Sequence, residues 1–446
     1  MIVAGEPRTS EALQQAVPVA MPVAATGESL GRTMALIAAA TFATTVANPL
    51  VIASLPFKYL LKDELGVGSI QMALFFAGAA LAWYAKPLLG LAADRLLEGR
   101  SPAAPLAICC GIGAIGWLAM GILPHTYVAL LLGALTLNIT IAVASNLVGG
   151  LTVLAGQAQG ATGRLNAAAM SSRHVGYLLV GPLGGYLAVR PMGITFGIGG
   201  AVMAAAAVAV ALLWKAPASA PRYPAERFDW RRLFSSRPLL LCGLMIFLLQ
   251  IAPGFETPLF FVQTNTLKFA PEFIGMLGLY AGVAGIAAGM SYGLLCRRFS
   301  PVAMLAVGIV ADAAASAGFL FYRNETAAIA LSIASGFATT LAFIPMMDIA
   351  ARSTPRLIAC GGFALMMSIR TITSHGSDVL GSWLFDTVHL TFRQLVWINS
   401  GTTLLALLAL PTLAASVGKS REAAEYSTRT PNAGARPRTT SNSIRR

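Results

Sequence analysis

The stretch LAWYAKPLLGLAADRLLEGR, residues 81–100, places charges in an order that decides the fold. Lys86 lies inside an almost wholly apolar run, and Asp94, Arg95 and Arg100 follow where that run ends. A lone lysine within an apolar segment, followed by a compact group of charges, is typical of a membrane-spanning helix that runs into a short polar loop. The stretch therefore predicts a helix inside a membrane.

The composition of the whole chain points the same way. Of the 446 residues, 56% are hydrophobic and only 11% are charged, whereas soluble domains carry about 25% charged residues. Apolar runs of about 20 residues, each able to cross a ~30 Å hydrocarbon core as a helix, recur from position 33 to position 416. The sequence therefore predicts an all-α polytopic membrane protein.

Several other classes of protein are disfavoured. The net charge of +13 comes from short loops and the C-terminal region, so we expect no nucleic acid as a partner. The five cysteines lack metal-binding spacing, and no Walker A loop is present. The four histidines form no nucleophile or metal constellation. We therefore expect no cofactor, no metal and no enzymatic activity.

Polar breaks divide the chain into two predicted halves of six spans each. The longest break, the basic segment 215–238, separates an N-terminal half (33–214) from a C-terminal half (239–416). Residues 1–32 and 417–446 are expected to be disordered cytoplasmic tails. The twelve transmembrane helices are expected near 34–58, 69–93, 104–123, 127–155, 165–189, 192–214, 239–264, 272–296, 302–322, 327–350, 359–385 and 393–416.

The loop charges predict the orientation. Even-numbered gaps between spans hold thirteen Lys and Arg residues, whereas odd-numbered gaps, with Lys58 counted in the first, hold six. By the positive-inside rule, the even gaps and both termini are cytoplasmic. The N-terminus carries no signal or transit pattern, and the loops are short. We expect a monomer in the inner membrane of a bacterium.

The loop after the second predicted span resembles the cytoplasmic loop motif of the major facilitator superfamily. The pattern G-x3-D-R-x3-G-R is formed by Gly90, Asp94, Arg95, Gly99 and Arg100. A glycine lets helices approach closely, and the acid can pair with an arginine or cap a helix, which would hold the inward side shut. A degenerate copy, GLLCRRF at 293–299, follows the eighth span. The resemblance implies two six-helix repeats around a central cavity.

Three segments resemble the folate–biopterin transporter family within this superfamily. LPFKYLLKDELGVGSIQMALFFAGAALAWYAKPLLGLAADR (55–95) matches an LKDELG-like loop and a W-x-x-K-P-x-x-G-x-x-x-D run. FFVQTNTLKFAPEFIGMLG (260–278) is similar to the family's segment after helix 7, and GGFALMMSIRTITSHGSDVLG (361–381) resembles its helix 11. Two positions depart from the family pattern: Asn146 stands where acids are usual, and Arg370 replaces a small or amide residue.

Three basic residues within predicted spans are candidates for binding an anionic solute, because intramembrane charges usually face a cavity. They are Lys86, Arg173 and Arg370. For Lys86, pairing with a buried acid and snorkelling to the interface are alternatives. Further candidate substrate contacts are Gln250, Trp83 and Asn146.

Acidic residues are candidates for coupling and gating. Glu256 lies beside Pro253 and Pro258, which break the seventh span, and Asp378 lies in the eleventh; both are candidate proton carriers. Asp348 and Arg352, four apart, are expected to pair at an inner gate together with the loop motif. Asp312 lies in a span that is peripheral in this fold, where an interhelical hydrogen bond is the alternative to a cavity role.

Taken with the resemblance, these residues predict a secondary transporter that moves a small organic solute by alternating access with protons as the coupling ion, and a folate- or pterin-like anion is the candidate solute. Its partners would be the solute, protons and the lipid bilayer. Two alternatives remain open at this point. One is a proton-driven exporter of drugs or metabolites, and the other is a non-transporting membrane receptor or docking protein.

Overall fold

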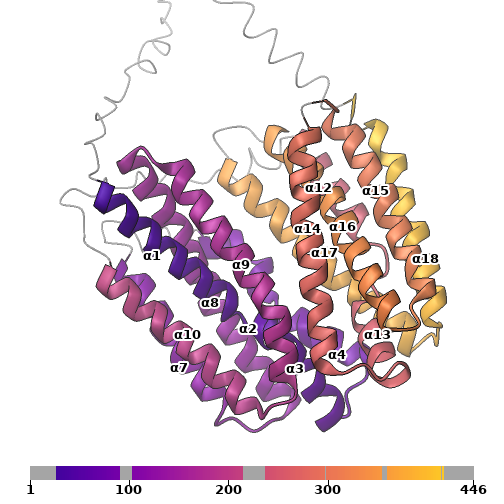
Figure 1. Cartoon of the computed structure of the whole chain (residues 1–446), viewed down its shortest axis with the longest axis horizontal. Coiled ribbons are helices and arrows are strands. Elements are labelled where there is room, and N and C mark those ends of the chain that lie inside the picture. Colours follow the sequence, from indigo (N-terminus) through magenta and orange to yellow (C-terminus); the bar gives the residue numbers. More distant parts are fainter. Residues whose placement is uncertain are drawn as a thin grey trace, which may run out of the picture.

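The computed structural model describes residues 27–90, 103–213, 237–296, 298–353, 359–412 and 414–415. Throughout these ranges the chain forms helices and short connections, with no strand. Figure 1 shows the helices as two lobes, one from each half of the sequence. The predicted all-α fold is confirmed.

The N-terminal lobe contains ten described helical elements. They are α1 (Gly27–Val46), α2 (Pro49–Ile52), α3 (Ser54–Tyr59), η1 (Leu60–Glu64), α4 (Ser69–Ala79), α5 (Leu81–Tyr84), α7 (Ala103–Met120), α8 (Tyr127–Gln159), α9 (Thr162–Ala188) and α10 (Met192–Leu213). Residues 86–90 continue the helical path after α5. Helix α1 begins at Gly27, before the apolar run that starts at position 33, so its first turns contain the polar residues Glu28 and Arg32.

The C-terminal lobe is described in the same way. Its elements are α12 (Arg237–Gln250), α13 (Glu256–Phe261), η2 (Val262–Thr266), α14 (Pro271–Leu295), α15 (Pro301–Gly318), η3 (Phe319–Phe321), α16 (Glu325–Ser353), α17 (Ala359–Asp386), and α18 with its short extension η5 (Phe392–Leu405 and Ala406–Ala409).

Six described helices are long and apolar enough to cross a membrane. These segments are Tyr127–Thr152, Met192–Leu213, Pro271–Leu295, Pro301–Phe321, Glu325–Ile349 and Phe392–Thr412. Four shorter apolar helices accompany them: Leu30–Val46, Ser69–Ala79, Ala104–Met120 and Leu240–Gln250. The chain is thus a multi-pass membrane protein, and the full count of twelve spans stays a prediction.

The first and seventh predicted spans are interrupted for reasons that the sequence explains. Pro49 cannot donate the backbone hydrogen bond that would continue α1, and the Asn48 side chain accepts from the backbone N of Leu50 at 2.8 Å to start α2. In the seventh span, α12 ends at Gln250, and α13 begins at Glu256 after a segment that contains Pro253. The first break places the Asn48 side chain, and the second places Glu256, within a helical lobe.

A large hydrophobic core holds the N-terminal lobe together. Trp117, Phe57, Phe75 and Phe196 are among its fully buried side chains. The Trp117 indole N donates a hydrogen bond of 2.9 Å to the carbonyl of Ala47, which lies in the break after α1. The core therefore packs the lobe and also satisfies a backbone group that the broken helix leaves free.

The backbones of the two lobes come into direct contact near one end of the molecule, which we call the closed end. It carries the connections at 64–69, 188–192 and 266–271. Here α9 and α14 meet backbone to backbone: a Cβ placed on Gly275 would lie 2.5 Å from the carbonyl oxygen of Gly181. The carboxylate of Asp386, the last residue of α17, accepts a hydrogen bond of 2.8 Å from the backbone N of Ile70 in α4. This bond caps a helix of one lobe with a side chain of the other.

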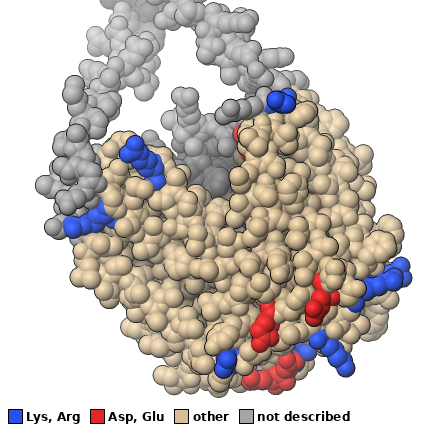
Figure 2. Space-filling view, in the orientation of Figure 1, with Lys and Arg blue, Asp and Glu red and all other residues tan. Residues whose placement is uncertain are grey.

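The opposite end, which we call the open end, carries the start of α1, the end of α10 and the start of α12. Figure 1 shows the lobes diverging towards this end, and the outline in Figure 2 is notched between them. The charged side chains in Figure 2 lie near the two ends, with a broad uncharged band between them. That band is the surface expected to face lipid.

Candidate functional site

Lys86 is held by an aromatic ring rather than by an acid. Its Nζ lies 5.0 Å from the ring centroid of Trp83, a distance suited to a cation–π contact. The Trp83 indole N donates at 2.8 Å to the Oδ1 of Asn138, and the amide of Asn138 donates at 2.9 Å to the carbonyl of Ala134 in α8. Among the described residues Lys86 forms no ion pair. The described contacts therefore position its charge through Trp83.

Arg173 and Arg370 come close to the same region from α9 and α17. Arg173 is near enough to Lys86 for the two positive charges to repel one another. The guanidinium of Arg370 lies 4.3 Å from the ring centroid of Phe343, and it interacts electrostatically with Tyr177, one turn beyond Arg173 on α9. The structure thus places Lys86 and Arg173 of the N-terminal lobe near one another, and Arg370 of the C-terminal lobe near Tyr177 on the same helix as Arg173.

Arg370 also lines a small pocket inside the C-terminal lobe. Gln250 of α12 and Asp312 of α15 line the same pocket, so a guanidinium, an amide and a carboxylate share one space. The Arg370 Nε is buried and has no hydrogen-bond partner among the described residues. Asp312 Oδ1 accepts a hydrogen bond of 2.7 Å from the hydroxyl of Thr339 in α16, which is the interhelical bond considered for it from the sequence.

An ion pair joins the two lobes near the closed end. Lys58 Nζ of α3 lies 2.9 Å from Glu256 Oε1 of α13, and we call this contact the Lys58–Glu256 bridge. The ring centroids of Phe76 and Phe260 lie 5.7 and 5.8 Å from the same ammonium group. The Lys58 side chain is only 11% exposed, whereas that of Glu256 is 77% exposed. The lysine is therefore enclosed, whereas the Glu256 side chain is largely exposed.

Asp378 organises the break in the seventh span. Its two carboxylate oxygens accept from the backbone N of Thr257 at 2.9 Å and from the Thr257 hydroxyl at 2.5 Å, which caps the first turn of α13. Next to it, the carbonyl of Ser377 accepts from the Gly254 N at 2.9 Å, and the Ser377 hydroxyl donates to the carbonyl of Ala252. These bonds fix α13, and with it Glu256, against α17.

The predicted gating residues are only partly described. Asp348 Oδ2 accepts a hydrogen bond of 2.7 Å from the Tyr292 hydroxyl, so this acid joins α16 to α14. Gly90 faces α8, where a Cβ on it would lie 3.9 Å from the Asn146 amide N, an atom that is buried without a partner in the described part of the chain. Asp94, Arg95 and Arg100, and the side chain of Arg352, lie outside the described residues.

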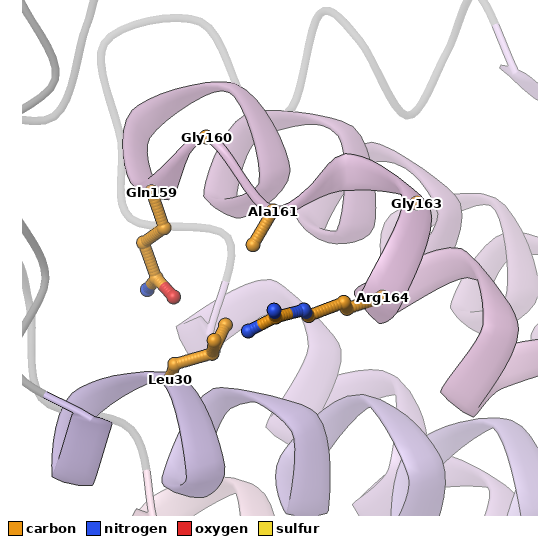
Figure 3. A pocket seen from close by; sticks show the side chains of 6 residues that line it. All are labelled: Leu30, Gln159, Gly160, Ala161, Gly163 and Arg164. Carbon is orange, nitrogen blue, oxygen red and sulfur yellow. The ribbon is translucent and has the colours of Figure 1, made fainter.

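A separate cavity of about 470 Å³ lies at the open end of the N-terminal lobe, between α1, α8 and α9. Figure 3 shows the Arg164 side chain extending across it towards Leu30, with the Gln159 amide to one side. The Gln159 Nε2 donates at 3.1 Å to the Thr33 hydroxyl. The three central cations are not among the residues that line this cavity.

Comparison with known proteins identifies the family. The model of the Major Facilitator Superfamily matches residues 33–377, about three quarters of the chain. The protein belongs to this superfamily. A curated relative from Synechocystis sp. (strain ATCC 27184 / PCC 6803 / Kazusa), named folate-biopterin transporter, is 26% identical over 392 residues, which cover 82% of this chain and 79% of the relative. The resemblance found in the three sequence segments is thereby confirmed.

Solved structures of transporters share the fold. The nucleoside transporter NupG superimposes with a TM-score of 0.63 at 16% identity, covering 87% of this chain and 99% of that one. The POT family transporter PepTSo gives a TM-score of 0.68 at 13% identity, covering 89% and 99%. As a superfamily member the protein is an integral membrane transporter of small-molecule solutes, and the superfamily is one of transporters rather than of enzymes.

Sequence reasoning missed two residues that this superfamily member places between its lobes. Lys58 was counted with an outer loop, although the apolar residues on both sides of it, in LPFKYLL, are a signal that it is enclosed. The sequence gives no signal for the contact of Asp386, because its partner Ile70 is 316 positions away. Neither contact could be found from local spacing.

Proposed function

We propose that the protein transports a small organic anion of the folate or pterin type across a bacterial inner membrane. Two observations support this proposal: Lys86 and Arg173 lie close enough to repel one another, and the buried Nε of Arg370 has no hydrogen-bond partner among the described residues. Repulsion between neighbouring cations in a poorly solvated place is relieved by an anion bound among them. The printed name of the Synechocystis relative agrees with this class of solute.

Alternating access would follow from a rocking motion of the two lobes. The lobes meet at the closed end through α9 and α14 and through the Asp386 cap, and they diverge at the open end. The positive-inside rule places the open end in the cytoplasm. A solute would then reach the central cations from the cytoplasmic side in this state and from the other side after rocking.

Protons are the proposed coupling ion, and Glu256 is the proposed carrier. Its side chain is 77% exposed and it touches the other lobe through Lys58, so we assign it as the group that takes up the proton. Asp378, the second candidate, is less free to exchange a proton, since both of its oxygens are bonded to Thr257. We therefore assign coupling to Glu256 and the positioning of α13 to Asp378. One chain carries all of these groups, so a monomer suffices.

The test is uptake of radiolabelled folate and of a simple pterin into proteoliposomes, with and without an inward proton gradient. We expect uptake that the gradient stimulates and that Lys86→Ala and Arg370→Gln each reduce by about tenfold or more, the effect of one lost charge-assisted contact. Arg323→Ala, which removes an exposed cation at the closed end, is the matched control and should leave uptake unchanged.

Two results would contradict the proposal. If the protein is folded but takes up neither compound, a folate-like solute is ruled out and export of other metabolites is favoured. The same vesicles, loaded with candidate metabolites, can detect export. Uptake that survives the combined loss of Lys86 and Arg370 would remove the cationic centre from the mechanism.

A further inference from the structure

The Lys58–Glu256 bridge has an asymmetry that an ordinary structural ion pair does not need. Its lysine is enclosed between the rings of Phe76 and Phe260, while the side chain of its glutamate is largely exposed. An enclosed ammonium group is costly when it lacks an anionic partner. An exposed carboxylate regains hydration when it leaves. Lys58 therefore needs an anionic partner to avoid this cost, but that partner need not be Glu256.

The position of the bridge adds a second demand. Lys58 belongs to α3 of the N-terminal lobe and Glu256 to α13 of the C-terminal lobe. Close to the bridge, the rings of Tyr59 and Phe260 also meet across the two lobes, with their centroids 5.2 Å apart. Whatever removes the carboxylate from Lys58 thus cuts a direct tie between the lobes near the closed end.

We propose that Lys58 is an anion-binding residue of the transport cycle, and that Glu256 occupies it only while no solute is bound. An anionic group of the solute, such as a carboxylate, would take the place of Glu256 beside the ammonium group. The released Glu256 would then take up a proton, so that one proton enters for each anionic group bound. This inference rests on the proposed function and adds to it the residue at which solute and proton compete.

The charged groups around Glu256 are consistent with such an exchange. Lys58 attracts it from α3, while His375 and Asp378 act on it from α17. Asp378 is bonded to Thr257 and interacts electrostatically with Glu256, so a Glu256 carboxylate that has left Lys58 would meet repulsion from an ionised Asp378 until one of the two is protonated. His375 lies beside Tyr84 of the N-terminal lobe, with ring centroids 6.1 Å apart, and it is a further titratable neighbour on α17.

The exchange also links binding to the conformational change. A ligand shifts an equilibrium only through its different affinity for the two states. An anion that replaces Glu256 contacts Lys58 without tying it to α13, so the closed end loses its inter-lobe bridge when the solute binds. The free energy that held the lobes together becomes available for the rocking motion.

The test measures thermal stabilisation of the purified protein by a panel of small anions, namely folate, benzoate and succinate, with a neutral pterin for comparison, at pH 5.5 and 7.5. In Glu256→Gln the competing charge is gone, so we expect anions to bind about tenfold more tightly than to the wild type at pH 7.5. The wild-type affinity for folate and benzoate should rise from pH 7.5 to pH 5.5, because each anion that binds brings a proton to Glu256, whereas the affinity of the variant should change little. The neutral pterin should show neither effect.

Lys58→Ala should remove the gain in anion binding that Glu256→Gln gives, because the competition takes place at Lys58. Lys62→Ala is the matched control, because Lys62 pairs with Asp63 at 2.8 Å a few residues further along the same segment. If no anion stabilises Glu256→Gln more than the wild type, the proposal is overturned, since this variant leaves Lys58 without its competitor. That result would leave the proposed function standing if uptake still depended on Lys86 and Arg370. If uptake of folate and pterin is absent but anions still bind Glu256→Gln more tightly than the wild type, the proposed solute is wrong and the exchange at Lys58 stands.

Discussion

The contact between α9 and α14 at the closed end gives a prediction whose size follows from the geometry. In Gly275→Ala, the new Cβ would lie 2.5 Å from the carbonyl oxygen of Gly181 and 2.8 Å from the backbone of Gly185. Backbone atoms on both sides leave no flexible side chain that could move aside. Restoring the 3.4 Å of ordinary contact requires the two helices to separate by about 0.9 Å.

This separation penalises only the state in which the closed end is closed. Overpacking of a tight contact costs about 1–3 kcal/mol. The same free energy corresponds to about a 5- to 150-fold change in an equilibrium between two states. We therefore expect Gly275→Ala to shift the population, by a factor within this range, towards molecules that are open at the end that is closed here.

Distances between paired spin labels measure the shift in a cysteine-free background. A pair at Arg164 and Arg298 reports on the open end, and a pair at Arg190 and Lys268 reports on the closed end. In Gly275→Ala the first distance should shorten and the second should lengthen, each as a change in the weight of two populations.

Gly278→Ala is the matched control, because it lies on the same helix and its Cβ would meet the nearest atom, the Cα of Gly181, at an ordinary 3.8 Å. This control should leave both distance distributions as in the wild type. Equal shifts in the two variants, or no shift in Gly275→Ala, would refute the reasoning that backbone contact at Gly181 holds the closed end.

Three further substitutions follow from the hydrogen bonds of the described residues. Asp386→Ala removes the cap that one lobe supplies to α4 of the other, and the closed-end label distance should lengthen with a cost of about 0.5–2 kcal/mol; Asp386→Asn should retain part of the cap, and equal behaviour of the two would argue against capping. Asp378→Asn weakens both bonds to Thr257 and should lower the melting temperature by several degrees; an unchanged melting temperature would contradict the positioning role. Trp83→Phe deletes the indole donor to α8 but keeps a ring under Lys86, so uptake should fall by about fivefold through lost positioning, the size of one neutral hydrogen bond; an unchanged rate would show that this bond does not place the lysine.

Much of the fold could be predicted because it depends on local composition. Apolar runs of membrane length predict helices wherever they occur, and Pro49 and Pro253 mark the two breaks in the helical path. The motif around Gly90 and the segments that resemble the family then select one arrangement of helices among many. These signals are read from residues close together in the sequence.

The candidate site was predictable only in part, because contacts between the lobes have no local signature. The intramembrane positions of Lys86, Arg173 and Arg370 made them candidates, since a charge in an apolar run needs an explanation. Which acid meets which base could not be predicted. Lys58 and Glu256 are 198 positions apart, and the pairing depends on how one lobe lies against the other.

The cap on α4 has a consequence for how the protein is made. Synthesis completes the N-terminal lobe long before Asp386 leaves the ribosome, so during that interval the backbone N of Ile70 has no carboxylate to accept its hydrogen bond. Newly inserted α4 is therefore expected to stay frayed at its first turn until the eleventh span enters the bilayer. Protease nicking near residue 68 during translation, and protection afterwards, would record this late step of assembly in the living cell.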